Sequence, residues 1–460
     1  MNFTPPFPCP HKSKSTFFLR FLRGWRSWLD VLFERSYRMK LGHYRQPGLD
    51  VYMVNEPSLV RRILVEKPRE YPKHKLMHQM LEPLLGNSIF TTNGEVWERQ
   101  RRLMDQAFEQ ARLRLVFPLM RGAVDDMAQR LDAVANGQPY AIDGEMTHVT
   151  ADIIFRTILT APLSEREANE IFEAFIEFQS HAQRAMVLGM YRLPAGFARR
   201  ASARCAARIR GVLATVIKAR FDARERGEKV AREDILSALM EAVDPVNGDR
   251  FSYEEMVDQI CMLFLAGHET SASALAWALY LLSRSPDLQR AMHEEIESVA
   301  GGRDLEFSDI KKLRNTWNLF RETLRLYPPV GFFVREAVQT HCMRDKEIRP
   351  GSPVLVSPWL IQRHRDHWER PDEFDPCRFE TAEGKESARK AYLPFSIGER
   401  VCIGAAFATQ EAILILASIM RRYEVLAVAD HVPQPVGRVT IRSNNGIYVR
   451  LKRREMIHVG

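Results

Sequence analysis

The sequence has few cysteines and no paired cysteine motif. The six cysteines among its 460 residues are Cys9, Cys205, Cys261, Cys342, Cys377 and Cys402. Disulfide-stapled secreted proteins pair their cysteines, and zinc sites group cysteine and histidine at short, regular spacings. Neither arrangement occurs here, so we expect a reduced, cytoplasmic protein without a zinc site.

The sequence also lacks a long uninterrupted hydrophobic run near its N-terminus. Residues 16–40 are rich in Phe, Leu and Trp, but Arg20, Arg23 and Arg26 interrupt them. A helix that spans a bilayer needs about 20 consecutive, mostly apolar residues. We therefore expect no transmembrane anchor and no clear signal peptide, and an amphipathic segment over residues 1–40 that packs on the protein's own body. Contact of residues 16–40 with a membrane surface is the alternative.

No nucleic-acid-binding motif accompanies the formal net charge of +8. The arginines cluster in one stretch of sequence, at Arg99, Arg101, Arg102, Arg112 and Arg114. A solvated charged surface explains most single arginines. As a group, they are better explained as ligand contacts together with a basic docking face for an acidic protein partner.

The stretch Phe395–Gly404 has the composition of a loop that holds one cysteine sulfur against a metal-bearing macrocycle. Its glycines, Gly398 and Gly404, permit positive φ or the close approach of a flat ligand. Phe395 can cover a sulfur with an apolar ring, and Arg400 is placed to pair with an acidic group. Residues 405–423 read as a buried helix, so Cys402 lies near a helix N-terminus, which favours an anionic sulfur.

The spacing Phe-x-x-Gly-x-Arg-x-Cys-x-Gly, with Pro394 before it, resembles the haem-binding signature of the cytochrome P450 superfamily. The resemblance extends from about Arg35 to the C-terminus and implies a soluble bacterial type of member. It implies haem b (iron protoporphyrin IX) as cofactor, with Cys402 as axial ligand of the iron and Phe395 and Arg400 as haem contacts.

A long buried helix is predicted over Ser252–Arg284, because apolar residues run almost unbroken through it. Its middle, Ala266–Ser271, places an acid and an alcohol where the pattern calls for hydrocarbon. Gly267 weakens the helix locally, and the Thr270 hydroxyl can bond a backbone carbonyl. The segment resembles the oxygen-activating part of the P450 long helix. That resemblance implies that Thr270 helps hold dioxygen and water, while Glu269 relays protons from solvent.

Two further motifs match the family. Glu322 and Arg325 stand three residues apart among apolar neighbours, where buried charges need partners. They resemble the family's Glu-x-x-Arg pair, which implies Arg378 as the third member of a structural ion-pair network. Cys377 stands where the family usually has an acid.

Trp97 and Arg101 lie one helical turn apart, after the turn at Asn93-Gly94. By resemblance this pair binds a haem propionate, and Arg335 matches the position of another propionate-binding arginine. His268 is expected to be a packing or surface residue and not an iron ligand.

The pattern predicts a mainly α protein with a small β region, forming a single domain over residues 1–460. Short strands are expected at 37–41, 51–54, 353–356 and 446–450, around a turn at Gln46-Pro47-Gly48, with a helix over 56–66. The resemblance implies the cytochrome P450 fold, with haem sandwiched between the long central helix and the cysteine loop with its following helix.

The function implied is that of a haem-thiolate monooxygenase, which inserts one atom of O2 into an apolar small molecule. No flavin or iron–sulfur signature occurs, so electrons would come from a separate ferredoxin or flavodoxin-type donor with its reductase. A non-catalytic haem-thiolate sensor or carrier and a peroxide-driven relative are the alternatives. The acid and alcohol in the long helix argue against both.

By resemblance, the substrate pocket would be lined by the loop 80–90, by residues 263–266 and 330–334, and by the tip 443–446. Leu263, Phe90, Phe332 and Phe333 imply a mostly hydrocarbon ligand. As a whole, and on no single motif, the chain resembles rhizobial members linked to diterpenoid oxidation, which implies a terpenoid-like substrate.

Overall fold

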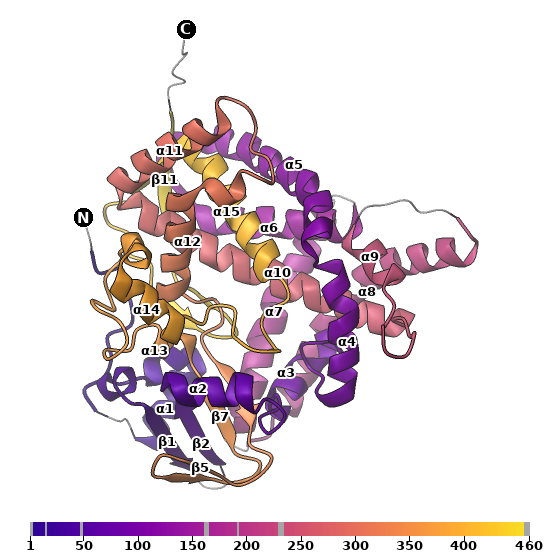
Figure 1. Cartoon of the computed structure of the whole chain (residues 1–460), viewed down its shortest axis with the longest axis vertical. Helices are drawn as coiled ribbons and strands as arrows, with labels where there is room; N and C mark the ends of the chain where they lie inside the picture. The colour runs from indigo at the N-terminus through magenta and orange to yellow at the C-terminus, as the bar shows by residue number, and fades with distance from the viewer. Residues whose placement is uncertain are drawn as a thin grey trace.

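The computed structural model describes residues 3–13, 16–46, 49–160, 165–190, 193–228 and 234–454. Most of these residues are helical, and the strands form small sheets at the periphery (Figure 1). The α-helices are α1 (Phe17–Arg26), α2 (Pro57–Arg61), α3 (Lys75–Leu85), α4 (Gly94–Ala107), α5 (Gln110–Val134), α6 (Ile142–Leu159), α7 (Glu165–Met190), α8 (Gly196–Glu225), α9 (Ile235–Glu241), α10 (Tyr253–Ser283), α11 (Pro286–Ala300), α12 (Arg314–Leu326), α13 (Pro358–Ile361), α14 (Ala382–Ala391) and α15 (Ala405–Arg422).

The strands are β1 (Leu41–Gln46), β2 (Leu49–Val54), β3 (Asn136–Ala141), β4 (Phe333–Glu336), β5 (His341–Met343), β6 (Lys346–Ile348), β7 (Pro353–Val356), β8 (Tyr423–Ala427), β9 (Pro435–Gly437), β10 (Ile441–Ser443) and β11 (Tyr448–Arg453). Short non-α turns cover η1 (Trp28–Val31), η2 (Glu34–Tyr37), η3 (Arg62–Glu66), η4 (Ile310–Lys312) and η5 (Pro376–Glu380). Together the helices and sheets give a mainly α fold with a small β region.

Helix α10 runs through the centre of the molecule and packs against α6, α8, α12 and α15. Its start is fixed by a capping box, in which the Ser252 hydroxyl accepts a hydrogen bond from the Glu255 amide and the Glu255 carboxylate accepts one from the Ser252 amide. A helix that is apolar on all sides must be buried on all sides. The predicted range is confirmed, with Ser252 as N-cap and Arg284 as C-cap.

The largest sheet has the strand order β1-β2-β7-β4, with β2 and β7 parallel and the other neighbours antiparallel. The strand expected at 37–41 is wrong, because η2 ends at Tyr37 and β1 begins only at Leu41. Tyr37 is buried instead, and its hydroxyl accepts a hydrogen bond from Trp359 Nε1 at 3.0 Å. The expected turn at Pro47-Gly48 lies outside the described residues.

The strand expected at 446–450 begins later than predicted. Gly446 has a φ of 73°, in the left-handed region, so the strand β11 starts at Tyr448. The strand over 353–356 is confirmed as β7, and the helix over 56–66 is α2 continued by η3.

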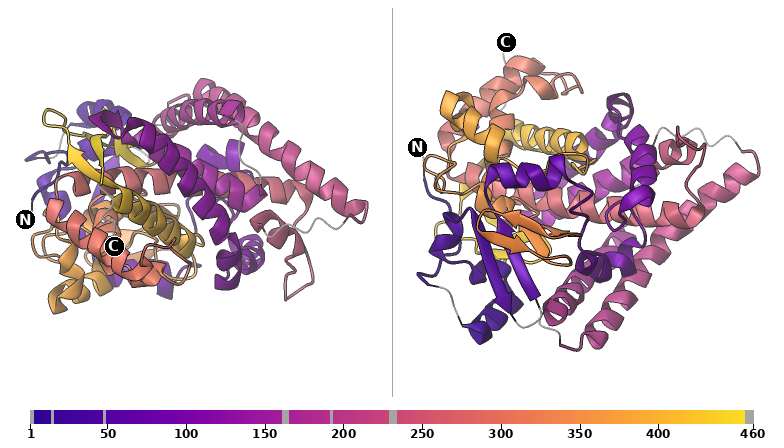
Figure 2. Two further views of the ribbon diagram at one scale, coloured as in Figure 1. Left: turned by 90° about the horizontal axis from the view of Figure 1, so that it is seen from above. Right: turned by 60° about the horizontal axis from the view of Figure 1, so that its bottom comes forward.

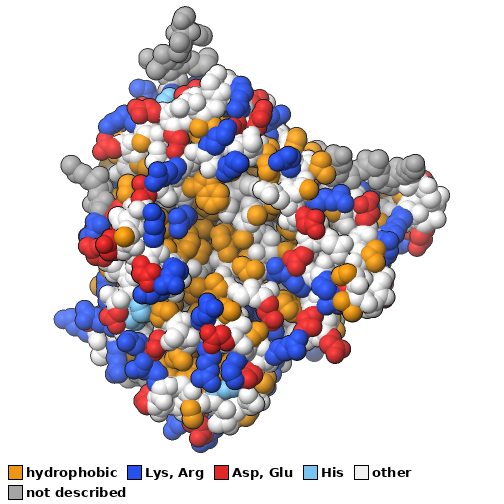
Figure 3. All heavy atoms as spheres, in the orientation of Figure 1, with side chains coloured by type: hydrophobic (Ala, Val, Ile, Leu, Met, Phe, Trp, Pro, Cys, Tyr) orange, Lys and Arg blue, Asp and Glu red, His pale blue; other side chains and the backbone are white. Residues whose placement is uncertain are grey.

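Helices α7 and α8 pack along each other and project from the central body (Figure 2). The amphipathic segment near the N-terminus forms α1 and η1, and α1 contacts α7. No helix in the described part of the chain is both long enough and apolar enough to cross a bilayer. On the face shown in Figure 3, hydrophobic side chains gather near the middle and charged side chains surround them.

Candidate active site

The loop before α15 is shaped by two residues with positive φ. Gly398 has a φ of 80°, and a Cβ added there would lie 2.2 Å from the Leu64 carbonyl oxygen. Ser396 also has a positive φ of 64°. The Cys402 amide donates to the Phe395 carbonyl oxygen at 2.9 Å, which closes the loop on itself. Gly404, by contrast, has no special conformation and serves as the N-cap of α15.

The Cys402 thiol lies deep in the protein yet keeps accessible surface. Burial raises the pKa of the thiol, while the Gly404 amide and the charge of Arg101 act in the opposite direction. Because burial dominates, the thiol stays protonated until a cation bound to the sulfur stabilises the thiolate. An enclosed sulfur with open surface is suited to coordinating a metal that enters with a large ligand.

Four cationic side chains gather near this loop, namely Lys73, Arg101, Arg335 and Arg400, which we call the Lys73 cluster. The Arg101 guanidinium donates to the Val401 carbonyl oxygen at 2.7 Å, which joins α4 to the cysteine loop. Trp97, 5 % exposed, lies between two of the cations. Its ring centroid is 5.6 Å from Lys73 Nζ and 5.2 Å from Arg400 Cζ. The cluster therefore draws together α4, β4 and the loop.

The Lys73 cluster has too few acids. Burial, together with the neighbouring arginines, holds the pKa of Lys73 well below its usual range, and burial together with Arg400 lowers the pKa of Arg335 to about 10. Neither forms an ion pair with any carboxylate that the structure describes. The nearest acid to Arg400 is Glu399, at 3.5 Å. Buried cations without counterions favour an anionic ligand, and two carboxylates would suit this site.

Lys73 is a residue that the sequence analysis missed. Its ammonium donates to the Ile89 and Thr92 carbonyl oxygens at 2.5 and 3.0 Å, and its backbone forms a bridge with Arg335. Its sequence neighbours, Pro72 and His74, give no sign of a ligand site. Only the pairing with the distant strand β4 brings this lysine to the site.

Thr270 lies on α10 with its hydroxyl donating to the Ala266 carbonyl oxygen at 2.6 Å. The helix stays continuous here, and Gly267 has a packing role as well. A Cβ at Gly267 would lie 2.4 Å from Ile154 Cδ1, so this glycine lets α6 approach α10 closely. The half-buried Thr270 hydroxyl is thereby set on a rigid helix.

Glu269 points away from solvent and is clamped to β10 and the residue before it. Its carboxylate accepts a hydrogen bond from the Thr440 hydroxyl at 2.7 Å and pairs with Arg442 at 2.5 Å. Burial raises the pKa of Glu269, but Arg442, His268 and its hydrogen bonds outweigh burial and lower it overall. His268 is buried and stacks on Phe264, which is the packing role expected. Thr440 and Arg442 carried no signal in the sequence, because they approach Glu269 only in the folded chain.

Glu322, Arg325 and Arg378 form a second buried group of charges, the Glu322 cluster. Glu322 accepts hydrogen bonds from Arg325 at 2.7 and 2.8 Å and from Arg378 Nε at 3.0 Å. The remaining guanidinium N–H groups donate to backbone carbonyl oxygens of residues 362–373. Cys377, which directly precedes Arg378, is exposed.

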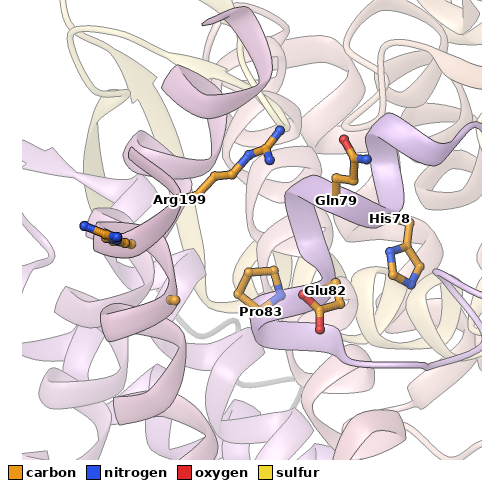
Figure 4. A pocket seen from close by; sticks show the side chains of 7 residues that line it. His78, Gln79, Glu82, Pro83 and Arg199 are labelled. Atoms are coloured by element: carbon orange, nitrogen blue, oxygen red, sulfur yellow. The ribbon is translucent and has the colours of Figure 1, made fainter. Parts of the chain in front are cut away.

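Of the segments expected to line a substrate pocket, residues 80–90 were expected to form a loop, and only part of them does. Residues 80–85 belong to α3, and only 86–90 follow it as a loop, because Met80, Leu81, Leu84 and Leu85 make an apolar helix face. Phe332 packs edge-on against Trp28, with ring centroids 5.2 Å apart, so the N-terminal segment also reaches this region. A separate surface hollow lies between α3 and α8, lined by His78, Gln79, Glu82, Pro83 and Arg199 (Figure 4). It contains none of the predicted site residues.

The arginines expected to form a docking face are partly neutralised. Arg99 pairs with Glu255, and Arg102 pairs bidentately with Asp244 at 2.6 and 2.8 Å. Arg112 lies 3.5 Å from Glu241. Arg114, exposed over the Phe307 ring, has no ion-pair partner among the described residues. Much of the local positive charge is therefore balanced within the chain.

The cytochrome P450 family model matches residues 32–448. The chain is 34% identical to cyclooctatin synthase of Streptomyces melanosporofaciens, over 82% of this chain and 80% of the relative. It is 29% identical to pentalenene oxygenase of Streptomyces avermitilis, over 88% of each chain.

Solved cytochrome P450 structures also match this chain. A crystal structure of a cytochrome P450 superposes with a TM-score of 0.83 at 25% identity, covering 98% of this chain and 100% of the other. The haem domain of cytochrome P450DA superposes with a TM-score of 0.79, over 90% of each chain. The expected fold is thus confirmed.

Proposed function

Because the chain belongs to the cytochrome P450 family, whose members bind haem b and act as monooxygenases, we propose that Cys402 is the axial ligand and that the substrate is an apolar, terpenoid-like molecule. The observation that carries the proposal is the enclosed but accessible Cys402 thiol beside the Lys73 cluster. A sulfur ligand next to buried cations without counterions fits a macrocycle that carries iron and two propionates. Haem bound through a cysteine thiolate supplies cleavage of the O–O bond of O2.

The roles of the other residues follow from their placement. Arg101, Arg335, Arg400 and Lys73 would bind the two propionates, with Trp97 packed among them and Phe395 beside the sulfur. Charge-assisted hydrogen bonds to carboxylates fix orientation as well as affinity. The Gly404 amide would donate to the sulfur from the start of α15.

Proton delivery would depend on Thr270 and Glu269. The Thr270 hydroxyl already has the Ala266 carbonyl as its acceptor, so its oxygen is free to accept a hydrogen bond from water. Glu269 is held as a carboxylate by Arg442 and Thr440, and in that position it cannot donate a proton. To act as a relay it must first turn away from Arg442. Replacing Thr270 by Ala should keep haem and substrate binding but divert electrons to peroxide, and a fully coupled Thr270→Ala variant would contradict this role.

The substrate proposal rests on the relatives and on the residues expected around the pocket. The relatives named above are a cyclooctatin synthase and a pentalenene oxygenase. Leu263 and Phe332, from α10 and the segment before β4, supply apolar surface. The ferric protein can be titrated with cyclic terpenes, steroids and fatty acids. The low-to-high spin shift should appear at lower concentrations of terpenes than of the other two classes. A shift with fatty acids alone would contradict the assignment.

The electron donor would be a ferredoxin or flavodoxin-type protein with its reductase, in a cytoplasmic setting. Since Arg99 and Arg102 are already paired, Arg114 is the better candidate contact on this side. An electrostatic contact weakens as salt rises, because screening shortens the range of charge interactions. Turnover with a ferredoxin should therefore fall with ionic strength, and Arg114→Gln should reduce that dependence.

A further inference from the structure

Trp28, in the short turn η1, contacts two segments that are far apart in the sequence. Its indole Nε1 donates to the Arg438 carbonyl oxygen at 3.2 Å, in the turn between β9 and β10. The same indole meets the ring of Phe332, just before β4, edge-on with the ring centroids 5.2 Å apart. One side chain from the N-terminal part of the chain therefore packs against both segments.

Each of the two segments carries a glycine where the indole approaches its backbone. A Cβ added to Gly331 would clash with Trp28 Cζ2, and one added to Gly437 would lie 2.5 Å from Trp28 Cε2. Carbon atoms in contact normally stay about 3.5–4.0 Å apart. The indole therefore fills the space that side chains at these two positions would need.

Hydrogen bonds hold the same three parts of the chain together. Ser27 is buried, and its hydroxyl oxygen accepts a hydrogen bond from the Gly437 amide at 2.9 Å. The Ile441 amide donates to the Pro329 carbonyl oxygen at 3.0 Å, which joins the two segments directly. We call Ser27 and Trp28 the N-terminal wedge, because they fix the place where these segments meet.

The two segments lead to the groups on which the proposed function depends. The turn between β9 and β10 is followed by Arg442, which pairs with Glu269 beside Thr270. Phe332 stands three residues before Arg335 of the Lys73 cluster. With haem at the Lys73 cluster, both segments would flank the space for substrate on the Thr270 side.

We propose that Trp28 is a positioning residue that sets the shape of the substrate pocket. It holds the backbone at Gly331 and Gly437 in place, so the pocket walls that these segments contribute are formed before substrate enters. Preorganised walls raise affinity, because binding does not have to order them. The N-terminal wedge precedes residue 32, where the match to the family model begins. This role rests on the proposed function, which supplies the haem and the pocket.

Binding of two azoles to the ferric holoprotein tests the role of Trp28. Imidazole and 4-phenylimidazole both bind haem iron through a nitrogen and shift the Soret band, but only the second has a phenyl ring that must contact the pocket walls. Trp28→Ala should weaken the binding of 4-phenylimidazole by at least about tenfold and that of imidazole by less than about twofold. Trp28→Phe, which keeps an aromatic ring in the wedge, should recover part of the loss.

The reciprocal variant is Gly331→Ala, which places a methyl group against the indole. Alone it should weaken the binding of 4-phenylimidazole by about tenfold, but in the Trp28→Ala background by less than about twofold, because the clashing ring is gone. If Trp28→Ala does not fold, Trp28→Phe serves as the background, since a phenyl ring lacks the Cζ2 edge that Gly331 faces.

The matched control is Trp25→Ala, which removes an indole that packs against Phe21 of its own helix, with ring centroids 5.9 Å apart. It should leave the affinities for both azoles unchanged. The same ratio of the two affinities in Trp28→Ala and the parent protein would overturn the role of Trp28, and so would additive effects of the substitutions at Trp28 and Gly331. A parent protein that binds neither azole would contradict the proposed function itself, because no haem iron would then be open to a ligand.

Discussion

The Glu322 cluster and the Lys73 cluster are both buried groups of charge, but only the first is complete. In the Glu322 cluster every guanidinium has a carboxylate or carbonyl partner within the chain. In the Lys73 cluster Arg101 pairs with Asp105 at 2.8 Å and Arg400 lies 3.5 Å from Glu399, but Lys73 and Arg335 have no ion-pair partner among the described residues. Burial and the neighbouring cations lower the pKa of both Lys73 and Arg335. A complete cluster stabilises the fold, whereas an incomplete one is built for a ligand.

The largest effect is expected from breaking the complete cluster. Glu322→Ala would leave Arg325 and Arg378 buried without a carboxylate, which costs about 3–5 kcal/mol when one partner of a buried pair is removed. That is a large part of a typical stability of about 5–15 kcal/mol. Circular dichroism melting and soluble yield should show a severely destabilised protein. Glu386→Gln, which removes an exposed pair with Arg389, should melt like the parent, and an equally mild Glu322→Ala would refute the structural role.

Replacing a buried acid that has no partner should have the opposite effect on stability. Glu411 on α15 is fully buried, and neither of its carboxylate oxygens has a hydrogen-bond partner in the described chain. Burial raises the pKa of this carboxyl group to about 8, and the neighbouring Ser271 side chain acts in the opposite direction. Between the ordinary glutamate pKa and this value, unfolding releases a proton, so stability falls as pH rises. Glu411→Gln removes that loss and should stabilise the protein at neutral pH by on the order of 3 kcal/mol. Denaturant unfolding at several pH values measures the gain, which should shrink toward acid; a gain that does not vary with pH would contradict the burial argument.

Removing one cation from the Lys73 cluster should weaken haem binding without destabilising the fold. Arg335→Leu removes one buried cation from its repelling neighbours, so the haem-free protein should not lose stability. Haem affinity should fall, because a hydrogen bond to a charged group contributes about 1.5–3 kcal/mol, or roughly tenfold to hundredfold. Transfer of haem to apomyoglobin measures this loss. Arg335→Lys should retain part of the affinity, and unchanged haem retention in Arg335→Leu would place the propionates elsewhere.

The smallest effect is expected at Glu269. Its ion pair with Arg442 is less buried than the Glu322 cluster, because the Arg442 side chain is partly exposed. Pairing with Arg442 lowers the pKa of Glu269 in the folded protein. The ion pair therefore contributes fully to the free energy of unfolding above the ordinary pKa of glutamate, and this contribution is lost as pH falls through the lowered pKa. Arg442→Gln should therefore destabilise the protein by about 1 kcal/mol at neutral pH, with the difference vanishing in acid. Thermal melts across pH measure the difference, with the exposed Arg438→Gln as control. A constant difference at all pH values would mean that Arg442 acts through packing.

The sequence alone predicted the elements whose signals are local. The bounds of α10 followed from the almost unbroken run of apolar residues between Ser252 and Arg284, and α15 followed from the buried-helix pattern after the cysteine loop. Trp97 and Arg101 were placed together because they are one turn apart. Short strands were less predictable, because β1 and β11 start where tertiary contacts and the left-handed Gly446 allow.

The residues that the sequence did not reveal depend on contacts between distant segments. Lys73 reaches the site through a bridge to Arg335, and Arg442 meets Glu269 although the two residues are 173 positions apart in the sequence. Glu411 looks like an ordinary helix residue until α10 covers it. In each case the chemical character of the side chain comes from burial and from its neighbours, which no spacing in the sequence encodes.

The most direct test of the account is the absorption spectrum of the reduced, CO-bound protein. If the Cys402 thiolate is the axial ligand, the Soret band should lie at the long wavelength that is characteristic of the family, and Cys402→His should move it to the shorter wavelength of histidine-ligated haem. A parent protein that shows only the short-wavelength band, with haem fully bound, would contradict the assignment of Cys402.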